Sequence, residues 1–212
     1  VFAARAAPLQ ASWLDYFCTT GLGEIDYLIT DDYLAPVGSD AFYSETLLRL
    51  MPGRLCYTPP PAPTPSTEGV EARRLVCLNR FSKINDEVAA AWSAALLRLP
   101  GWSLRLKGTG GDDAGVANAL RRRFAAHGVD PKRLDIFGEG PYAEAIDAYR
   151  DAAVALDPFP FSGCATSFDA LWMGLPVVTL PLDTMASRQT GSILSAIGRK
   201  DWIADDVGAY VD

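Results

Sequence analysis

Residues 156–174 read LDPFPFSGCATSFDALWMG and decide the fold that we expect. The apolar run at residues 153–159 is typical of a buried strand, and residues 166–174 have the apolar spacing of a helix. A corner rich in proline and glycine joins the two. The first N–H groups of a helix lack partners within it and the helix dipole is positive there, so this corner favours an anion. Such a corner also occurs as plain scaffolding, and both interpretations stay open.

Gly163 permits a sharp turn at this corner. We expect the N–H groups of Cys164 to Ser167 to point away from the helix start, toward a phosphate or diphosphate. Asp169, in the expected first turn, suits the positive end of the helix and could accept a hydrogen bond from a ribose. Lys83 would be the opposing point charge. A plain helix-start role for Asp169 and a solvated surface position for Lys83 are the alternatives.

Strands alternate with helices on both sides of this stretch. The expected strands lie at residues 74–79, 102–108, 133–138, 153–159, 176–181 and 201–204. The expected helices lie at residues 85–100, 112–129, 142–152, 166–174 and 185–198, with Asn85 as the cap of the first. Such alternation with short connections predicts a parallel sheet with helices on both faces. An α/β, Rossmann-like domain is therefore expected from about Arg73 onward.

Ligands of such sheets bind beyond the carboxyl ends of the strands. The loop after the first expected strand offers Asn79, Arg80, Ser82 and Lys83. The turn after the third contains Gly140, where the backbone can approach a ligand closely. Other conspicuous side chains have plainer interpretations: His127 as a helix-end or surface residue, the arginines at 121–123 as a solvated face, and Trp92 and Trp172 as core.

The chain before residue 73 has a different pattern. Residues 25–30 predict a short strand, and residues 44–53 have apolar residues at helical or extended spacing. Five prolines between Pro59 and Pro65 exclude a helix or a central strand there. Residues 58–72 are therefore expected to be an extended linker and a domain boundary.

The composition fits a soluble globular protein, with 49% apolar and 21% charged residues among 212. The net charge of −7 argues against a nucleic-acid partner. No window reaches the roughly 18 apolar residues of a membrane helix. The chain starts without a methionine or a signal peptide, so we interpret its start as internal to a longer protein.

The four cysteines, Cys18, Cys56, Cys77 and Cys164, are widely spaced and form no C-x-x-C pair. With a single histidine in the chain, a zinc site is not expected. Cys77 lies in an apolar strand and is interpreted as a small core residue. A reducing cytoplasm fits this cysteine usage best.

Several segments, in this order along the chain, resemble the O-GlcNAc transferase/SPINDLY family of glycosyltransferases, bacterial members especially. These are APLQASWLDYFCTTGLGEIDYLITDDYLAP, YSETLLRL, NRFSKIND, LDPFPFSGCATSFDALWMGLPVVTL and ASRQTGSIL. The resemblance implies a GT-B fold, in which two Rossmann-like domains face each other across a cleft. Residues 1–57 would end the first domain, 58–72 would be the linker, and 73–212 the donor-binding second domain. Tetratricopeptide repeats that recruit protein acceptors are expected upstream in the full protein.

The resemblance also implies roles for individual residues. Lys83, at the end of the N-x-x-x-K segment that starts at Asn79, would contact the donor diphosphate, and Arg80 would lie near the base. The phosphate-binding loop would consist of Gly163, Cys164, Ala165 and Thr166. Asp169 would contact the ribose and Gly140 the base. Leu14 and the Thr19, Thr20 and Gly21 segment would lie near the sugar.

This chain departs from the family pattern at several positions. Ala165 replaces a threonine, and losing one hydroxyl contact costs about 1 kcal/mol. Cys164 stands where the family has glycine or histidine, and Ala145 where animal relatives have a histidine. Phe17 and Cys18 replace a Pro-Gly or Pro-Asn pair. Asp15 replaces a glycine, and its carboxylate would repel a diphosphate if it pointed into the cleft.

The resemblance implies inverting transfer of a sugar, GlcNAc from UDP-GlcNAc, to Ser or Thr hydroxyls of proteins, without a metal or another cofactor. The family's upstream histidine has no counterpart here, so the fragment alone is expected to bind donor without full turnover. Three alternatives stay open: a GDP-fucose-dependent O-fucosyltransferase, a transferase for glycans or small molecules, and a degenerate module that only binds nucleotide sugars.

Overall fold

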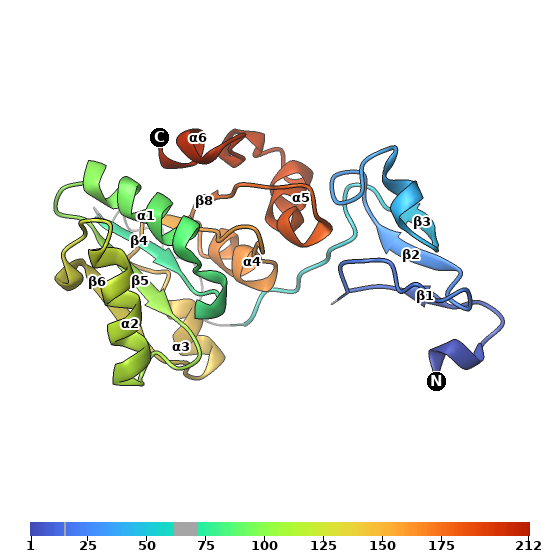
Figure 1. Ribbon diagram of the computed structural model, residues 1–212, viewed down its shortest axis with the longest axis horizontal. Coiled ribbons are helices and arrows are strands. Elements are labelled where there is room, and N and C mark those ends of the chain that lie inside the picture. The colour runs from blue at the N-terminus through green and yellow to red at the C-terminus, as the bar shows by residue number, and fades with distance from the viewer. Residues whose placement is uncertain (15, 62–71) are drawn as a thin grey trace.

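The computed structural model describes residues 1–14, 16–61 and 72–212, and contains two parallel sheets (Figure 1). The smaller sheet has the order β1-β2-β3. Its strands are β1 (Ala11–Ser12), β2 (Tyr27–Thr30) and β3 (Thr46–Arg49). The ambiguous spacing at residues 44–53 thus becomes a strand, in which only Leu47 is buried among its four residues.

The larger sheet has five parallel strands in the order β6-β5-β4-β7-β8. They are β4 (Arg74–Cys77), β5 (Ser103–Lys107), β6 (Leu134–Phe137), β7 (Val154–Leu156) and β8 (Val177–Val178). The helices that connect and follow them are α1 (Asp86–Arg98), α2 (Ala114–Ala125), α3 (Tyr142–Asp147), α4 (Ala165–Trp172), α5 (Gln189–Ala196) and α6 (Val207–Val211). The predicted alternation of strands and helices is confirmed.

Successive residues of β4 point to opposite faces of this sheet, so each face has its own core. Leu75 and Cys77 pack with α1, α2 and α6, whereas Val76 packs with α3 and α4. Helices therefore cover both faces, as predicted. The prediction that Cys77 is a core residue is also confirmed, because it is 2% exposed.

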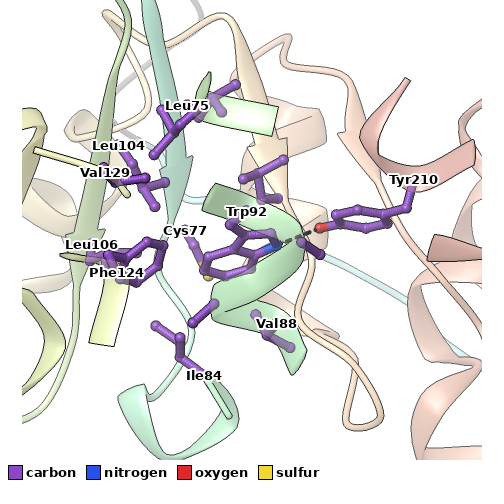
Figure 2. Close-up of a cluster of buried hydrophobic side chains, with 14 of the residues drawn as sticks. Leu75, Cys77, Ile84, Val88, Trp92, Leu104, Leu106, Phe124, Val129 and Tyr210 are labelled. Atoms are coloured by element: carbon purple, nitrogen blue, oxygen red, sulfur yellow. Dashed lines mark hydrogen bonds between the residues drawn. The ribbon is translucent and has the colours of Figure 1, made fainter. Parts of the chain in front are cut away.

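Trp92 of α1 lies at the centre of the first core (Figure 2). It is 0% exposed, and its indole Nε1 donates to the hydroxyl of Tyr210 at 2.9 Å. Trp172 packs against the second core but is only half-buried. The predicted cap of α1 is confirmed as well, since the Asn85 side chain accepts from the N–H of Val88 at 2.8 Å.

The C-terminal quarter differs in two places from the sequence-based expectation. Residues 201–204 do not form a strand, because the 3-10 turn Lys200–Trp202 carries the chain past the sheet edge and only Ile203 bridges to Thr179. The single expected helix at 185–198 divides into the 3-10 turn Met185–Ser187 and α5. The side chain of Thr184 accepts from the N–H of Ser187 and so caps that turn separately.

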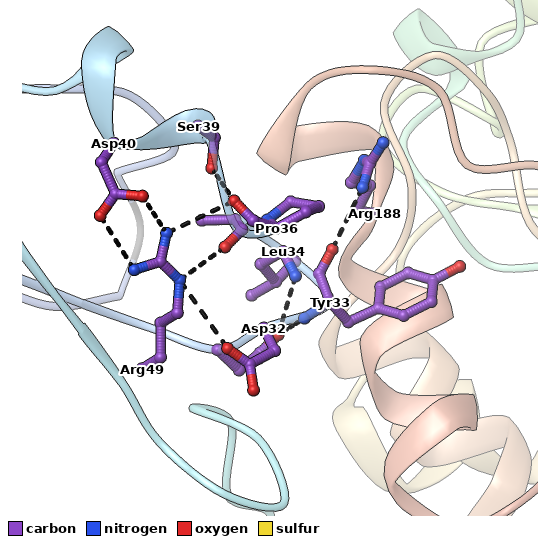
Figure 3. Close-up of polar contacts among 10 residues, drawn as sticks. Asp32, Tyr33, Leu34, Pro36, Ser39, Asp40, Arg49 and Arg188 are labelled. Atoms are coloured by element: carbon purple, nitrogen blue, oxygen red, sulfur yellow. Dashed lines mark hydrogen bonds and ion pairs between the residues drawn. The ribbon is translucent and has the colours of Figure 1, made fainter.

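The two sheets contact each other through α5. Asp31, directly after β2, accepts the hydroxyl of Ser192 at 2.8 Å. Arg188 donates to the carbonyl of Tyr33 at 3.3 Å (Figure 3). A Cβ on Gly191 would lie 2.5 Å from the Tyr33 ring, so a glycine is needed where that ring packs on the helix. Most of the predicted linker lies outside the described residues, and the domain boundaries at 57/58 and 72/73 stay a prediction.

Candidate functional site

A cleft of about 1050 Å³ is lined by residues of both sheet regions. It lies beyond the carboxyl ends of β4 and β7, where a parallel sheet places its ligands. The predicted site residues that line it are Leu14, Asn79, Arg80, Lys83, Cys164, Ala165 and Thr166. The fold therefore brings together most of the positions that the sequence singled out.

Lys83 lies beside the start of α4. Its Nζ donates to Asn79 Oδ1 at 3.0 Å and to the carbonyl oxygen of Ser162 at 2.8 Å, and it lies 4.4 Å from the centroid of the Phe161 ring. Burial lowers the pKa of Lys83, and the nearby carboxylate of Asp157 opposes that shift. The alternative of a solvated surface lysine is therefore wrong.

The start of α4 has one polar side chain without a protein partner. The hydroxyl oxygen of Thr166 is buried and makes no hydrogen bond with any described residue, yet Thr166 lines the cleft. The expectation for Ser167 is wrong, because its N–H donates to the carbonyl of Cys164 at 3.1 Å. The first turn of the helix is thus tighter than expected, and the donors available to a ligand lie before Ser167.

Asp157 directly follows β7 and stabilises this corner by hydrogen bonds from its buried carboxylate. It is 1% exposed, and its Oδ1 accepts the N–H of Gly163 at 2.6 Å while Oδ2 accepts the hydroxyl of Thr179 at 2.7 Å. Burial raises the pKa of Asp157 to about 6, although these hydrogen bonds oppose the shift. A Cβ on Gly163 would lie 2.6 Å from Ser167 Oγ and 2.9 Å from Asp157 Oδ1, so the corner admits only a glycine.

Asp169 lies in the second turn of α4, not in the first as expected, because the helix begins at Ala165. It is 6% exposed, and its Oδ1 accepts the hydroxyls of Tyr57 and Tyr142, each at 2.6 Å. Burial and the bond to this carboxylate raise the pKa of both phenols. Asp169 is thus not merely a helix-start residue, because it ties Tyr57 of the chain's first part to α4.

The remaining predicted positions lie apart from the cleft wall. Gly140 is exposed after β6, next to Glu139, which does line the cleft. Thr19 and Thr20 both donate their hydroxyls to the carboxylate of Glu45, and Thr19 lines a neighbouring groove. Their role near a sugar stays a prediction. Asp15 lies outside the described residues.

The side chains given plainer roles behave mostly as expected. His127 is exposed beside Gly128, whose φ is 86°. The solvated face at 121–123 is wrong for Arg123, which donates to the carbonyl of Ile84 and pairs with Asp86 at 2.9 Å. In the described part of the chain, no group of three or more His, Cys, Asp or Glu could hold a metal ion, and no helix is long and apolar enough to cross a membrane.

Sequence reasoning missed two residues of this site. Asp157 falls within the strand expected at residues 153–159 and has no predicted role there, yet in the structure it accepts the N–H of Gly163 six residues further along. Arg54 lines the cleft from the other sheet region with a buried guanidinium. No local motif surrounds Arg54, so only the folded arrangement could have indicated it.

Two parallel α/β sheet regions that share a ligand cleft define the GT-B class of glycosyltransferase fold. The crystal structure of TarM, at 8% identity, shares this fold with a TM-score of 0.55 over 84% of this chain and 40% of its own. The chain belongs to glycosyl transferase family 41, whose model matches residues 1–55 and 71–212.

Individual relatives agree with this family. A Thermobaculum terrenum O-GlcNAc transferase mutant is 40% identical, with a TM-score of 0.95 over 100% of this chain and 41% of its own. The probable UDP-N-acetylglucosamine–peptide N-acetylglucosaminyltransferase SPINDLY of Petunia hybrida is 32% identical over 100% of this chain, and the probable enzyme SEC of Arabidopsis thaliana is 32% identical over 93%. The chain spans only 23% and 21% of the lengths of these two plant proteins.

Proposed function

We propose that this chain supplies the donor-binding half of an enzyme that transfers GlcNAc from UDP-GlcNAc to Ser or Thr hydroxyls of proteins. The observation that carries the proposal is the pairing of Lys83 with the start of α4. A cation and an unpartnered hydroxyl, that of Thr166, face one cleft beside a helix N-terminus. The names of the family's relatives supply the donor and the acceptor class.

In this proposal the acceptor hydroxyl attacks the anomeric carbon of the sugar, and the bond from that carbon to the diphosphate oxygen breaks with inversion. The hydroxyl proton is released to the leaving diphosphate or to solvent. Negative charge develops on the leaving diphosphate. Lys83 and the first N–H groups of α4 stabilise that charge, because donors fixed in place before the reaction do not have to reorganise. Asp157 holds Gly163 and thereby keeps the helix start in position.

The second carboxylate oxygen of Asp169 would accept a ribose hydroxyl, since the first already accepts two phenols. Protein acceptors, upstream tetratricopeptide repeats and a donor used without metal belong to the same proposal. We also propose a cytoplasmic location, because Cys18, Cys56 and Cys77 form no disulfide with any described residue.

The test is titration calorimetry of the purified protein with UDP, UDP-GlcNAc, GDP and GDP-fucose. We expect binding of the uridine nucleotides and a tenfold or greater loss of UDP affinity for Lys83→Met. The matched control is Lys132→Met, which removes an exposed lysine that does not line the cleft. Preferential binding of GDP-fucose would replace the proposed donor, and absence of nucleotide binding would contradict the proposal.

A further inference from the structure

Arg54 follows β3 and lines the cleft with a guanidinium that is almost fully enclosed. The residue is 2% exposed. Its backbone is fixed on both sides, since its N–H donates to Asp31 Oδ2 at 3.1 Å and its carbonyl accepts Trp13 Nε1 at 3.2 Å. The backbone of Arg54 is therefore fixed, and the burial of the residue restricts its side chain.

The guanidinium itself is short of partners. Nη1 makes one long hydrogen bond, 3.4 Å, to the carbonyl of Ile29. Nε and Nη2 are buried and make no hydrogen bond with any residue that the structure describes. Buried N–H groups of a cation that lack acceptors are costly, and an arginine left so points to a ligand.

Asp31 does not neutralise this cation through a direct contact. Its Oδ1 accepts the N–H groups of Tyr33 and Leu34, and its Oδ2 accepts the N–H of Arg54 and the hydroxyl of Ser192. Within the described ranges, no ion pair joins the Arg54 guanidinium to a carboxylate. The carboxylate is fully used by other donors.

The two unpartnered nitrogens fit a particular ligand geometry. Nε–H and one Nη2–H project from the same edge of the guanidinium, with the spacing of two oxygens on one phosphorus or carbon atom. Lys83 and Thr166 line the same cleft. The Cys164 side chain, at the start of α4, is close enough to contribute to the electrostatics of both Arg54 and Lys83.

We propose that Arg54 binds the diphosphate of the donor through Nε and Nη2, together with Lys83 from the larger sheet region. This rests on the proposed function and adds a second cation, from the β1–β3 sheet region, to a site that the larger sheet otherwise supplies. The donor then bridges the two regions, because one phosphate-binding cation follows β3 and the other follows β4. Arg54 is a substrate-contacting residue in this arrangement.

Three variants test the assignment by calorimetry, with UDP and uridine as probes. We expect Arg54→Met to weaken UDP binding at least tenfold while leaving uridine binding unchanged. Arg54→Lys keeps the charge but lacks the paired Nε–H and Nη2–H donors, so we expect its UDP affinity to lie between those of the wild type and Arg54→Met. Arg122→Met removes an exposed arginine of α2 away from the cleft and is the control.

An unchanged UDP affinity in Arg54→Met, with Lys83→Met still defective, would overturn the role of Arg54 and leave the proposed function intact. Equal losses for UDP and uridine would also overturn it, since they indicate a general defect. Loss of UDP binding in the wild-type protein itself would mean failure of the proposed function. If Arg54→Met does not fold, hydrogen exchange of the Arg54 Nε–H with solvent is measured in the wild-type protein instead. UDP should slow this exchange, and uridine should not.

Discussion

The carboxylate of Asp157 lies 2.6 Å from the backbone nitrogen of Gly163. It is buried beneath the corner before α4, whose outer side lines the cleft. The same carboxylate accepts the hydroxyl of Thr179, and its backbone carbonyl accepts the hydroxyl of Tyr210. One buried acid thus connects the end of β7 with the start of α4 and the edge of the sheet.

Replacing Asp157 by asparagine should change how stability depends on pH. Burial raises the pKa of Asp157 from 3.8 to about 6, so the folded state holds this proton more tightly than the unfolded state. The wild type therefore loses stability from this group as pH rises from about 4 to about 6. A shift of about two units corresponds to about 3 kcal/mol.

We expect Asp157→Asn to gain stability relative to the wild type between pH 4 and pH 7, by about this amount, because it has no proton to lose there. Urea unfolding at both pH values measures the difference. Asp157→Ala is the contrasting variant, since it leaves the Gly163 N–H unpaired and should be destabilised by about 1–3 kcal/mol. If wild type and Asp157→Asn differ in free energy of unfolding by the same amount at pH 4 and pH 7, the raised pKa of Asp157 is contradicted.

Gly163→Ala should weaken both folding and UDP binding. The added Cβ would lie 2.6 Å from Ser167 Oγ and 2.7 Å from Thr166 Oγ1, so the start of α4 must shift. Overpacking of this kind costs about 1–3 kcal/mol. Thermal unfolding with and without UDP measures both effects. Gly23→Ala is the matched control, because nothing lies within 4 Å of a Cβ there.

Thr166→Val should have opposite effects on stability and on ligand binding. The hydroxyl of Thr166 is buried without a partner among the described residues, so its removal should stabilise the ligand-free protein by about 1 kcal/mol. The lost ligand contact should weaken UDP binding by a similar free energy, about fivefold.

Thr190→Val is the control for this variant. The hydroxyl of Thr190 is hydrogen-bonded to Ser167 Oγ at 2.8 Å and to the carbonyl of Gly163 at 3.2 Å, so its loss should destabilise the protein. Chemical unfolding and UDP titration of both variants give the comparison. Unaltered UDP affinity in Thr166→Val would remove Thr166 from the phosphate site.

Trp92→Ala should be the most destabilising of the core changes, by about 3–5 kcal/mol, because it leaves a cavity and removes one of the two hydrogen bonds of the Tyr210 hydroxyl. Leu97→Ala, on the same helix but 52% exposed, should cost much less. Guanidinium unfolding followed by circular dichroism measures both. Similar losses for the two would mean that Trp92 is not at the centre of the core.

The alternation of strands and helices could be predicted because each element here has a clear apolar period and a cap, such as Asn85. The corner at Gly163 was also predictable, since a Pro- and Gly-rich break separates the strand pattern from the helix pattern there. The structure adds that glycine is needed because a Cβ would lie 2.6 Å from Ser167 Oγ. The start of α4 was harder: Ser167 closes a tight first turn, and Asp169 lies one turn further along. Arg54 could not be predicted, because its role depends on two sheet regions meeting, which no local pattern encodes.

The bond from Tyr57 to Asp169 joins the chain just before the proline-rich crossover to the helix that begins at the cleft. The ring of Tyr57 also stacks on Phe168, with centroids 5.0 Å apart. A rotation of the first sheet region against the second would strain or break this hydrogen bond and this ring stacking. The carboxylate that we propose as the ribose contact therefore also helps to hold the two sheet regions in one mutual orientation.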